Sequence, residues 1–465
     1  MPGTSEETVV VTETAEDSLL DQIRAAIAVG DVEAARLCAN RMLEDDALAL
    51  LEDLEPGELT VLFTILGDEG LATLLSRLDD RDAARILTRM TAEQAADILE
   101  EIEPDDATDI FAEVEQADPE AAGTILVEME PEEAAEIREL MGYAPDSAGG
   151  IMTPAFVAVY PDLRADETVV ALRQVAEEAE TINYVYVVDR DETLIGVLSL
   201  HSLVLSRPET PVRDLMFPDL FTVTVDTDQE DAARLLVERD LLALPVVDND
   251  GKLVGIITAD DVADILEEEA TEDIERLGGS QPLSVPYLRA SPFLLFRKRI
   301  VWLMVLFVAS FFTVSIQEHY DSTLARYTIL AAFVPILIGT GGNVGSQTVS
   351  TIIRAMALDE VRPRHILRIV GKEALTGIAL GLVMGALMFG RAMLAEDGTE
   401  KIALVVGLTV LALTTWAATV GSILPIVLSK LKVDPAVVSA PFISSLVDST
   451  GLIIYFVLAG RLLDF

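Results

Sequence analysis

The sequence predicts a multidomain membrane protein, with a soluble acidic front followed by a helical membrane domain. Two observations support this fold class. Residues 1–296 carry 18 basic and 68 acidic side chains, whereas residues 297–465 carry 14 and 11. The second part contains five apolar runs, each long enough to cross a hydrocarbon core, at about 298–316, 324–349, 366–390, 402–428 and 436–461. An acidic surface of this density repels nucleic acid and attracts cations, so no nucleic-acid partner is expected.

The front begins with two segments of different character. Residues 1–16 are rich in Thr and Glu without apolar periodicity, which indicates a disordered tail. Residues 17–145 repeat short amphipathic helices whose first turns carry Pro or carboxylates, as in Ile102-Glu-Pro-Asp-Asp106. We expect this segment to be an all-α, superhelical N domain of stacked hairpins. The single Cys38 excludes an intramolecular disulfide.

Residues 146–207 and 208–259 repeat one pattern, in which a short helix precedes a strand, a turn, a second strand and another helix. The strands of the two copies match almost position for position: Tyr184-Val-Tyr-Val-Val188, Leu194-Ile-Gly-Val-Leu198, Ala243-Leu-Pro-Val-Val247 and Leu253-Val-Gly-Ile-Ile257. A methionine-containing segment precedes each copy, Ile151-Met-Thr-Pro154 or Leu215-Met-Phe-Pro218. The paired pattern resembles a tandem of α/β CBS domains, which are regulatory modules.

An acidic connecting helix, from Asp260 to about Leu277, then leads through a linker to residue 292. Residues 293–465 form the predicted membrane domain of five helices. Basic residues concentrate in the loops that this topology places in the cytosol, and the positive-inside rule therefore predicts a cytosolic N-terminus. No basic segment followed by an apolar core stands at the front, so no signal peptide is expected. We expect a multi-pass protein of the inner or plasma membrane.

Two of the apolar runs carry polar groups at membrane depth. The second contains Gly341-Gly-Asn-Val-Gly-Ser-Gln347, and the fifth contains Asp448. An ionisable residue in a membrane helix costs roughly 2.5–3.5 kcal/mol, so it normally faces a pore or a partner. The glycines are expected to loosen their helix. Asn343 and Asp448 are therefore candidates for lining an ion path; a helix–helix hydrogen bond or, for Asp448, a proton relay is the alternative.

The connecting helix carries a continuous acidic face. Asp261, Asp264, Glu268 and Glu272 recur every three or four residues and so lie on one side, with Glu269 and Asp273 beside them. Like charges at this spacing destabilise an isolated helix. We expect a bound divalent cation to relieve this repulsion.

With Glu267-Glu-Glu-Ala-Thr-Glu-Asp273, Asp434-Pro-Ala and Pro441-Phe, the chain resembles the MgtE family of magnesium channels over nearly its whole length. The resemblance implies a homodimer with its pore on the two-fold axis, gated by Mg²⁺ bound among the cytosolic domains. Mg²⁺ would be both substrate and regulator. Because this ion gives up its waters reluctantly, Asp448 and the Asn343 amide, with main-chain carbonyls near Gly341 and Ser444, are expected to contact its water shell.

The resemblance also implies further site residues. Regulatory Mg²⁺ would bind carboxylates of the N domain, the second CBS domain and the connecting helix: Asp106, Asp109, Asp228, Glu230, Asp240, Asp261, Asp264, Glu269 and Glu272. Glu318 matches an acidic position at the outer mouth, and Tyr184 matches a base-stacking position for ATP. Ser202 stands where nucleotide-binding CBS domains carry an acid for the ribose, so ATP binding stays open.

The sequence favours a Mg²⁺-selective channel that moves the ion down its gradient and is closed by cytosolic Mg²⁺. A cation-coupled secondary transporter of divalent metals would use the same intramembrane carboxylate and stays an alternative. A membrane-anchored nucleotide sensor is a third interpretation, supported by the CBS pair. An enzyme is not expected, because no nucleophile–base pair, phosphate loop or metal-hydrolase spacing is present.

Overall fold

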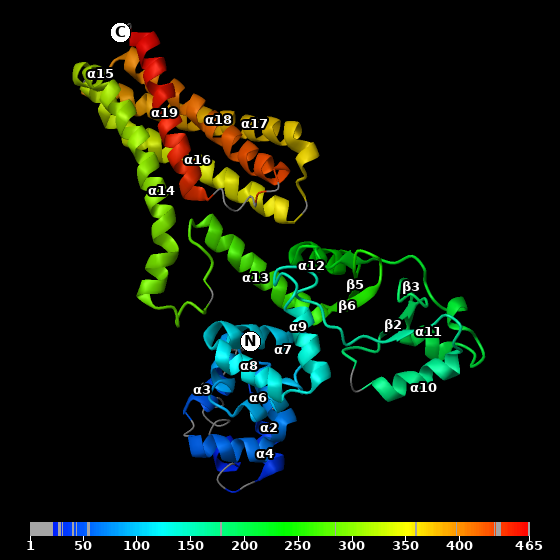
Figure 1. The fold of residues 1–465 in the computed structure, drawn as a ribbon. Helices are drawn as coiled ribbons and strands as arrows, with labels where there is room; N and C mark the ends of the chain where they lie inside the picture. Colours follow the sequence, from blue (N-terminus) through cyan, green and yellow to red (C-terminus); the bar gives the residue numbers. More distant parts are fainter. Residues whose placement is uncertain are drawn as a thin grey trace, which may run out of the picture. The chain divides into compact units, whose positions relative to one another are not determined.

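The computed structural model describes residues 22–463 except 27–28, 30, 40, 43, 54–55, 177–178, 284, 359, 397, 432 and 434–438. The expected disordered tail and the Asp434-Pro-Ala motif therefore lie outside the described residues. The chain divides into two compact units, Met1–Leu266 and Glu267–Phe465 (Figure 1). Each unit has hydrophobic cores of its own.

The N domain is all helical, as predicted. Its described helices are α2 (Val32–Ala39), α3 (Glu44–Asp53), α4 (Pro56–Leu75), α5 (Asp80–Leu87), α6 (Ala92–Leu99), α7 (Pro104–Ala117), α8 (Pro119–Glu128) and α9 (Pro131–Leu140). Helices α7, α8 and α9 begin with proline, and Thr91 and Gln94 form a capping box at α6. Gly67, at φ 69°, kinks α4, because this left-handed conformation favours glycine.

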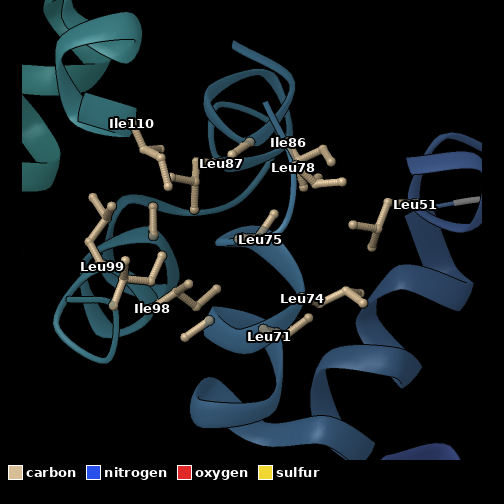
Figure 2. Packing of buried hydrophobic residues seen from close by; sticks show 14 of the residues in the cluster. Leu51, Leu71, Leu74, Leu75, Leu78, Ile86, Leu87, Ile98, Leu99 and Ile110 are labelled. Carbon is tan, nitrogen blue, oxygen red and sulfur yellow. The ribbon is translucent and has the colours of Figure 1, made fainter. Parts of the chain in front are cut away.

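Leucine and isoleucine side chains hold the helices of the N domain together. Figure 2 shows Leu75 of α4, Leu87 of α5 and Leu99 of α6 among the side chains that converge in one interior. All three are at most 1% exposed. The lone Cys38 is buried in the same cluster, which agrees with a packing role for this residue.

The two CBS repeats fold into matching three-stranded sheets. The first contains β1 (Ala158–Val159), α10 (Ala165–Val175), β2 (Tyr184–Val188), β3 (Leu194–Ser199) and α11 (Leu200–Leu205). The second contains β4 (Val223–Thr224), α12 (Gln229–Glu238), β5 (Ala243–Val247) and β6 (Leu253–Thr258), and η1 (Val212–Asp214) precedes it. In each sheet the first two strands are parallel and the last two antiparallel, and the register shifts at the same place in both hairpins.

The methionine-containing segments exchange between the two repeats. Met152, which precedes the first repeat, packs on Gly255 of the second, and the adjacent Thr153 pairs with Ile256. Met216 packs in the same way on Gly196 of the first repeat. A Cβ atom added to Gly255 would lie 2.6 Å from the Met152 sulfur, so glycine leaves the space that the methionine fills. Each repeat is therefore completed by a segment that lies next to the other repeat in the sequence.

The connecting helix α13 (Ala259–Leu277) is continuous and crosses the boundary between the two units. The membrane unit then contains five helices long and apolar enough to cross a bilayer, as predicted. The helices of this unit are α14 (Pro292–His319), α15 (Asp321–Arg326), α16 (Thr328–Ala357), η2 (Pro363–His365), α17 (Ile366–Met393), α18 (Glu400–Lys430) and α19 (Ala440–Leu463). Helices α16, α18 and α19 supply most of the buried core, whereas α14 has no buried residue.

Helices α17 and α18 approach each other closely along a row of glycines, Gly377, Gly381 and Gly385. The Thr414 hydroxyl of α18 donates a hydrogen bond to the Gly377 carbonyl at 2.9 Å. A Cβ atom at Gly381 would lie 2.4 Å from Thr414 Oγ1 and 2.7 Å from the Leu411 Cα. These glycines therefore serve close packing between the two helices.

Replacing Gly381 with Ala is expected to destabilise the membrane unit by about 1–3 kcal/mol, because the added methyl group forces α17 and α18 apart. Heating the detergent-solubilised protein in steps and measuring the folded fraction by size exclusion tests this. Gly371→Ala is the matched control on the same helix, since no heavy atom lies within 4 Å of its added Cβ. Equal melting temperatures for the two variants would contradict the expectation.

Candidate functional site

The candidate pore site lies where α16 packs on α19. A Cβ atom at Gly342 would lie 3.2 Å from Ser444 Oγ and 3.6 Å from Asp448 Oδ1. The neighbouring Gly341 and Gly345 face Val447 and Ile443 just as closely. The glycines therefore let the backbone of α16 lie against the face of α19 that carries Asp448.

This arrangement corrects one expectation about α16. The helix runs without interruption from Thr328 to Ala357, with Pro335 inside it. The glycines thus do not loosen the described helix. Their effect is close packing, because helix–helix contacts in membranes favour residues without side chains.

Asp448 differs from the other polar residues of α19. Its Oδ1 is buried and has no hydrogen-bond partner among the described residues. The hydroxyls next to it are paired: Ser449 Oγ lies 2.9 Å from Thr313 Oγ1, and Thr450 Oγ1 accepts the indole N–H of Trp416 at 2.9 Å. Burying an unpaired carboxylate oxygen costs free energy. Asp448 is therefore a candidate for contacting a cation or its water shell.

The other predicted pore residues lie around Asp448. One turn before it, Ser444 Oγ lies 3.1 Å from Ser346 Oγ of α16. Gly341 is buried, whereas the side chain of Asn343 is exposed on α16. Glu318 is exposed in the last turn of α14. The structure thus places Ser444 and Asp448 beside Gly342, the neighbour of Gly341, and it leaves Asn343 and Glu318 on the surface of the single chain.

A second candidate site is an acidic cluster within the first unit. Asp106, in the first turn of α7, interacts electrostatically with Asp261 and Asp264 of α13. These three predicted carboxylates are joined by three that the sequence did not indicate, Glu103, Asp105 and Glu180. Among the described residues, no three His, Cys, Asp or Glu side chains are arranged to bind a metal ion directly.

Asp105, Asp106, Glu180 and Asp261 are half-buried close to one another, whereas Glu103 and Asp264 are exposed. Burial, followed by the charges of Asp261 and Asp106, raises the pKa of Asp105 to about 8. Burial, followed by the charge of Glu103, raises the pKa of Asp106 and the pKa of Glu180 to about 7. Asp105 Oδ1 and Glu180 Oε2 are also buried without a hydrogen-bond partner among the described residues. A positive charge nearby would therefore favour ionisation of these groups near pH 7.

The raised pKa values predict that this unit loses stability as the pH rises. The carboxyls ionise near pH 4 in the unfolded chain, but only near about 8 for Asp105 in the folded chain. Between these values the folded state binds more protons, so the free energy of unfolding falls with rising pH. Melting temperatures of the full-length protein in detergent with a chelator, from about pH 5 to about pH 8, measure this.

Two controls accompany that measurement. Asp105→Asn combined with Glu180→Gln removes two titrating groups, so its melting temperature is expected to depend less on pH. Added Mg²⁺ is expected to raise the melting temperature more at high pH than at low pH, because it competes with protons for the carboxylates. A melting temperature that rises with pH, equally in the variant, would contradict the expectation.

The remaining predicted regulatory residues lie elsewhere on the described chain. Asp109 lies on α7 with Asp106. Asp228 caps α12, and Glu230 binds Arg234 at 2.5 Å. Asp240 follows α12 in a left-handed conformation. Glu269 and Glu272 lie on the part of α13 that belongs to the second unit, where Glu272 pairs with Arg276.

The predicted base-stacking residue Tyr184 packs between the two CBS repeats, in a cluster that contains Tyr186 and Ile256. Ser199 and Thr258 occupy equivalent positions, and each hydroxyl bonds to the side chain three residues later. Ser199 Oγ lies 2.8 Å from Ser202 Oγ, and Thr258 Oγ1 donates to Asp261 Oδ2 at 2.5 Å. The first repeat therefore carries only a hydroxyl where the second carries a carboxylate.

Comparison with known protein families agrees with this architecture. The family model described as a divalent cation transporter, MgtE, matches residues 334–458, and the model of the MgtE intracellular N domain matches 42–146. The CBS domain model matches 148–208 and 212–268. The magnesium transporter MgtE of Thermus thermophilus is 40% identical over 449 residues, which cover 97% of this chain and 99% of that protein. The chain belongs to the MgtE family of magnesium transporters.

Other members of the MgtE family and solved structures are also similar. The magnesium transporter MgtE of Bacillus subtilis is 36% identical over 323 residues, covering 70% of this chain and 71% of that protein. A crystal structure of the soluble part of a magnesium transporter covers 55% of this chain and 99% of that one, with 30% identity and a TM-score of 0.50. This MgtE-family chain is thus a multi-pass membrane transporter with an intracellular N domain, and it is not an enzyme.

Proposed function

We propose that this MgtE-family chain is a passive Mg²⁺ channel, assembled as a homodimer and closed by cytosolic Mg²⁺. The observation that carries the proposal is the buried, unpaired Asp448 Oδ1 beside the glycines of α16. In a dimer with the pore on its axis, two such carboxylates would face one hydrated divalent ion. Because Mg²⁺ is usually held through one or two carboxylates and retained waters, this small number of charges suits it.

The other pore residues have supporting roles in this proposal. The exposed Asn343 amide is available to contact the water shell in the assembled pore, together with main-chain carbonyls near Gly341 and Ser444. Glu318 would attract cations at the outer mouth. The exposed face of α14, which has no buried residue in the single chain, leaves ample surface for lipid and for a second subunit.

Gating is proposed to depend on the acidic cluster around Asp106, Asp261 and Asp264. Burial, and after it the charges of neighbouring carboxylates, raises the pKa of Asp106 and of Asp261, and a divalent cation would offset both effects. A ligand shifts a two-state equilibrium only by binding one state more tightly. Bound Mg²⁺ would therefore favour the compact arrangement, and α13, which is continuous from Ala259 to Leu277, would transmit the change toward the membrane unit.

ATP is proposed only as a possible additional ligand of the CBS pair. Tyr184 is half-buried between the two repeats, which suits a stacking role. Against this, Ser202 offers no carboxylate for the ribose hydroxyls, and Asp261 is already hydrogen-bonded to Thr258.

Mg²⁺ flux into liposomes tests the proposal. The voltage is fixed with K⁺ and valinomycin, and free Mg²⁺ is varied on the side of the cytosolic domains. A channel gives flux that follows the electrochemical gradient and stops as this Mg²⁺ rises. Flux that depends on a proton or sodium gradient at fixed voltage would instead support a coupled transporter, for which a lone intramembrane carboxylate is also suitable. Absence of flux in folded, dimeric protein would overturn both.

A further inference from the structure

A cavity of about 420 Å³ lies at the start of the membrane unit. Three segments line this open cavity: the end of α13 with Arg276, the linker from Gly279 to Pro282, and the stretch of α14 with Lys298, Val301 and Trp302. All of these residues belong to the second unit. The cavity thus has basic side chains at one part of its lining and an indole and a valine at another.

The linker that closes the cavity is held in place by specific contacts. Gly279 has a φ of 75°, and a Cβ atom there would lie 2.7 Å from Trp302 Cδ1. The Gln281 N–H donates to the Lys298 carbonyl at 3.1 Å. The Trp302 indole N–H in turn donates to Ser439 Oγ at 2.8 Å, next to α19. The cavity is therefore part of the folded membrane unit, and glycine is required for the close approach of the linker to the indole.

The charges around the cavity do not cancel. Arg276 pairs with Glu272, and the Glu275 carboxylate accepts the Leu283 N–H at 2.6 Å. Lys298 has no ion-pair partner among the described residues, and Arg297 and Arg299 flank it on α14. A half-buried ammonium group that lines a cavity without a counter-ion favours an anionic ligand.

We propose that this cavity binds the phosphate of an anionic membrane phospholipid, with Lys298 as its main contact. Helix α14 is apolar beyond its first turns and has no buried residue, so lipid chains can lie along it from Val301 onward. The cytosolic N domain places this end of α14 at the inner surface, where anionic lipids attract Lys and Arg. A tryptophan beside a lysine is typical of the level of the headgroups. A soluble phosphate ion would gain nothing from the apolar side chains of the lining, Val301 and Trp302.

Tryptophan fluorescence tests the proposal directly. The chain has only two tryptophans, so Trp416→Phe leaves Trp302 as the single reporter in the cavity. The full-length protein in bilayers is compared with bromine placed on phosphatidylglycerol or on phosphatidylcholine, at the same lipid composition. We expect stronger quenching of Trp302 by the brominated anionic lipid. The measurement does not depend on ion conduction, so it can fail or succeed independently of the proposed channel.

Two variants make the test specific to the cavity. Lys298→Gln is expected to weaken the preference for the anionic lipid by about tenfold or more, because it removes a charge-assisted hydrogen bond to the phosphate. Arg297→Gln removes the same charge from the adjacent position, which does not line the cavity, and is expected to weaken the preference clearly less, since only the general attraction to an anionic surface is lost. Equal quenching by the two lipids in the parent protein would overturn the proposal, as would equal losses in both variants. Displacement of the lipid by inorganic phosphate would also overturn it, in favour of a soluble anion.

Discussion

Mg²⁺ flux is expected to fall about 10- to 100-fold when Asp448 is replaced with Asn, because a hydrogen bond to a charged group contributes roughly 1.5–3 kcal/mol. Asparagine keeps the size of the side chain and an acceptor oxygen, but it removes the negative charge that we propose faces the hydrated ion. The buried Oδ1 has no partner in the described chain, so the substitution breaks no hydrogen bond there. The protein is therefore expected to stay folded and dimeric, and the loss should appear in the rate of flux through liposomes.

The neighbouring Ser449 provides the matched control for Asp448. It lies on the same helix, but its hydroxyl pairs with Thr313 Oγ1 at 2.9 Å. Ser449→Ala should therefore leave the flux and its preference for Mg²⁺ over Ca²⁺ nearly unchanged. If Asp448→Asn conducts Mg²⁺ as fast and as selectively as the parent protein, Asp448 does not line the pore. Asp448→Glu, which retains the charge on a longer side chain, distinguishes a requirement for charge from a requirement for fit.

The order of the domains and the five membrane helices could be predicted because both are local properties of the sequence. Apolar runs of sufficient length reveal membrane helices, and the two CBS repeats match each other position by position. The exchange of Met152 and Met216 between the repeats could not be predicted in this way. Sequence order associates each methionine with the repeat that follows it, whereas packing on Gly255 and Gly196 depends on contacts between distant segments.

The candidate sites were predictable to different degrees for the same reason. Asp448 is conspicuous in an apolar run, and its carboxylate is indeed unpaired among the described residues. Asp105 and Glu180 carry no comparable signal, because an acid in a helix start or a loop is ordinarily exposed. Their burial arises only when α7, α13 and the loop before β2 come together. The signal that was available is the Glu103-Pro-Asp-Asp106 helix start, which places three carboxylates in one turn.

Inhibition by cytosolic Mg²⁺ is expected to weaken by at least about tenfold when Asp106, Asp261 and Asp264 are replaced together with Asn, which corresponds to roughly 1.4 kcal/mol of coupling. The substitution keeps an acceptor oxygen for the Thr258 hydroxyl that now donates to Asp261. It also removes charged groups from a partly desolvated site, where burial and then neighbouring carboxylates, Asp261 and Asp264 among them, raise the pKa of Asp106. In the absence of Mg²⁺ the variant should thus be more stable than the parent protein, and Mg²⁺ should stabilise it less. Flux through liposomes at varied cytosolic Mg²⁺ measures the inhibition.

A second triple variant distinguishes the effect of these three carboxylates from the effect of the large negative charge of residues 1–296 as a whole. Glu115→Gln, Asp191→Asn and Glu209→Gln remove the same total charge from exposed positions of the same unit. Long-range attraction of cations falls equally in both variants, since it depends on summed charge. If the two variants lose inhibition to the same extent, the front senses Mg²⁺ through its overall field. If only the cluster around Asp106 matters, the sensor requires carboxylates that the fold holds together, and bound Mg²⁺ relieves their repulsion.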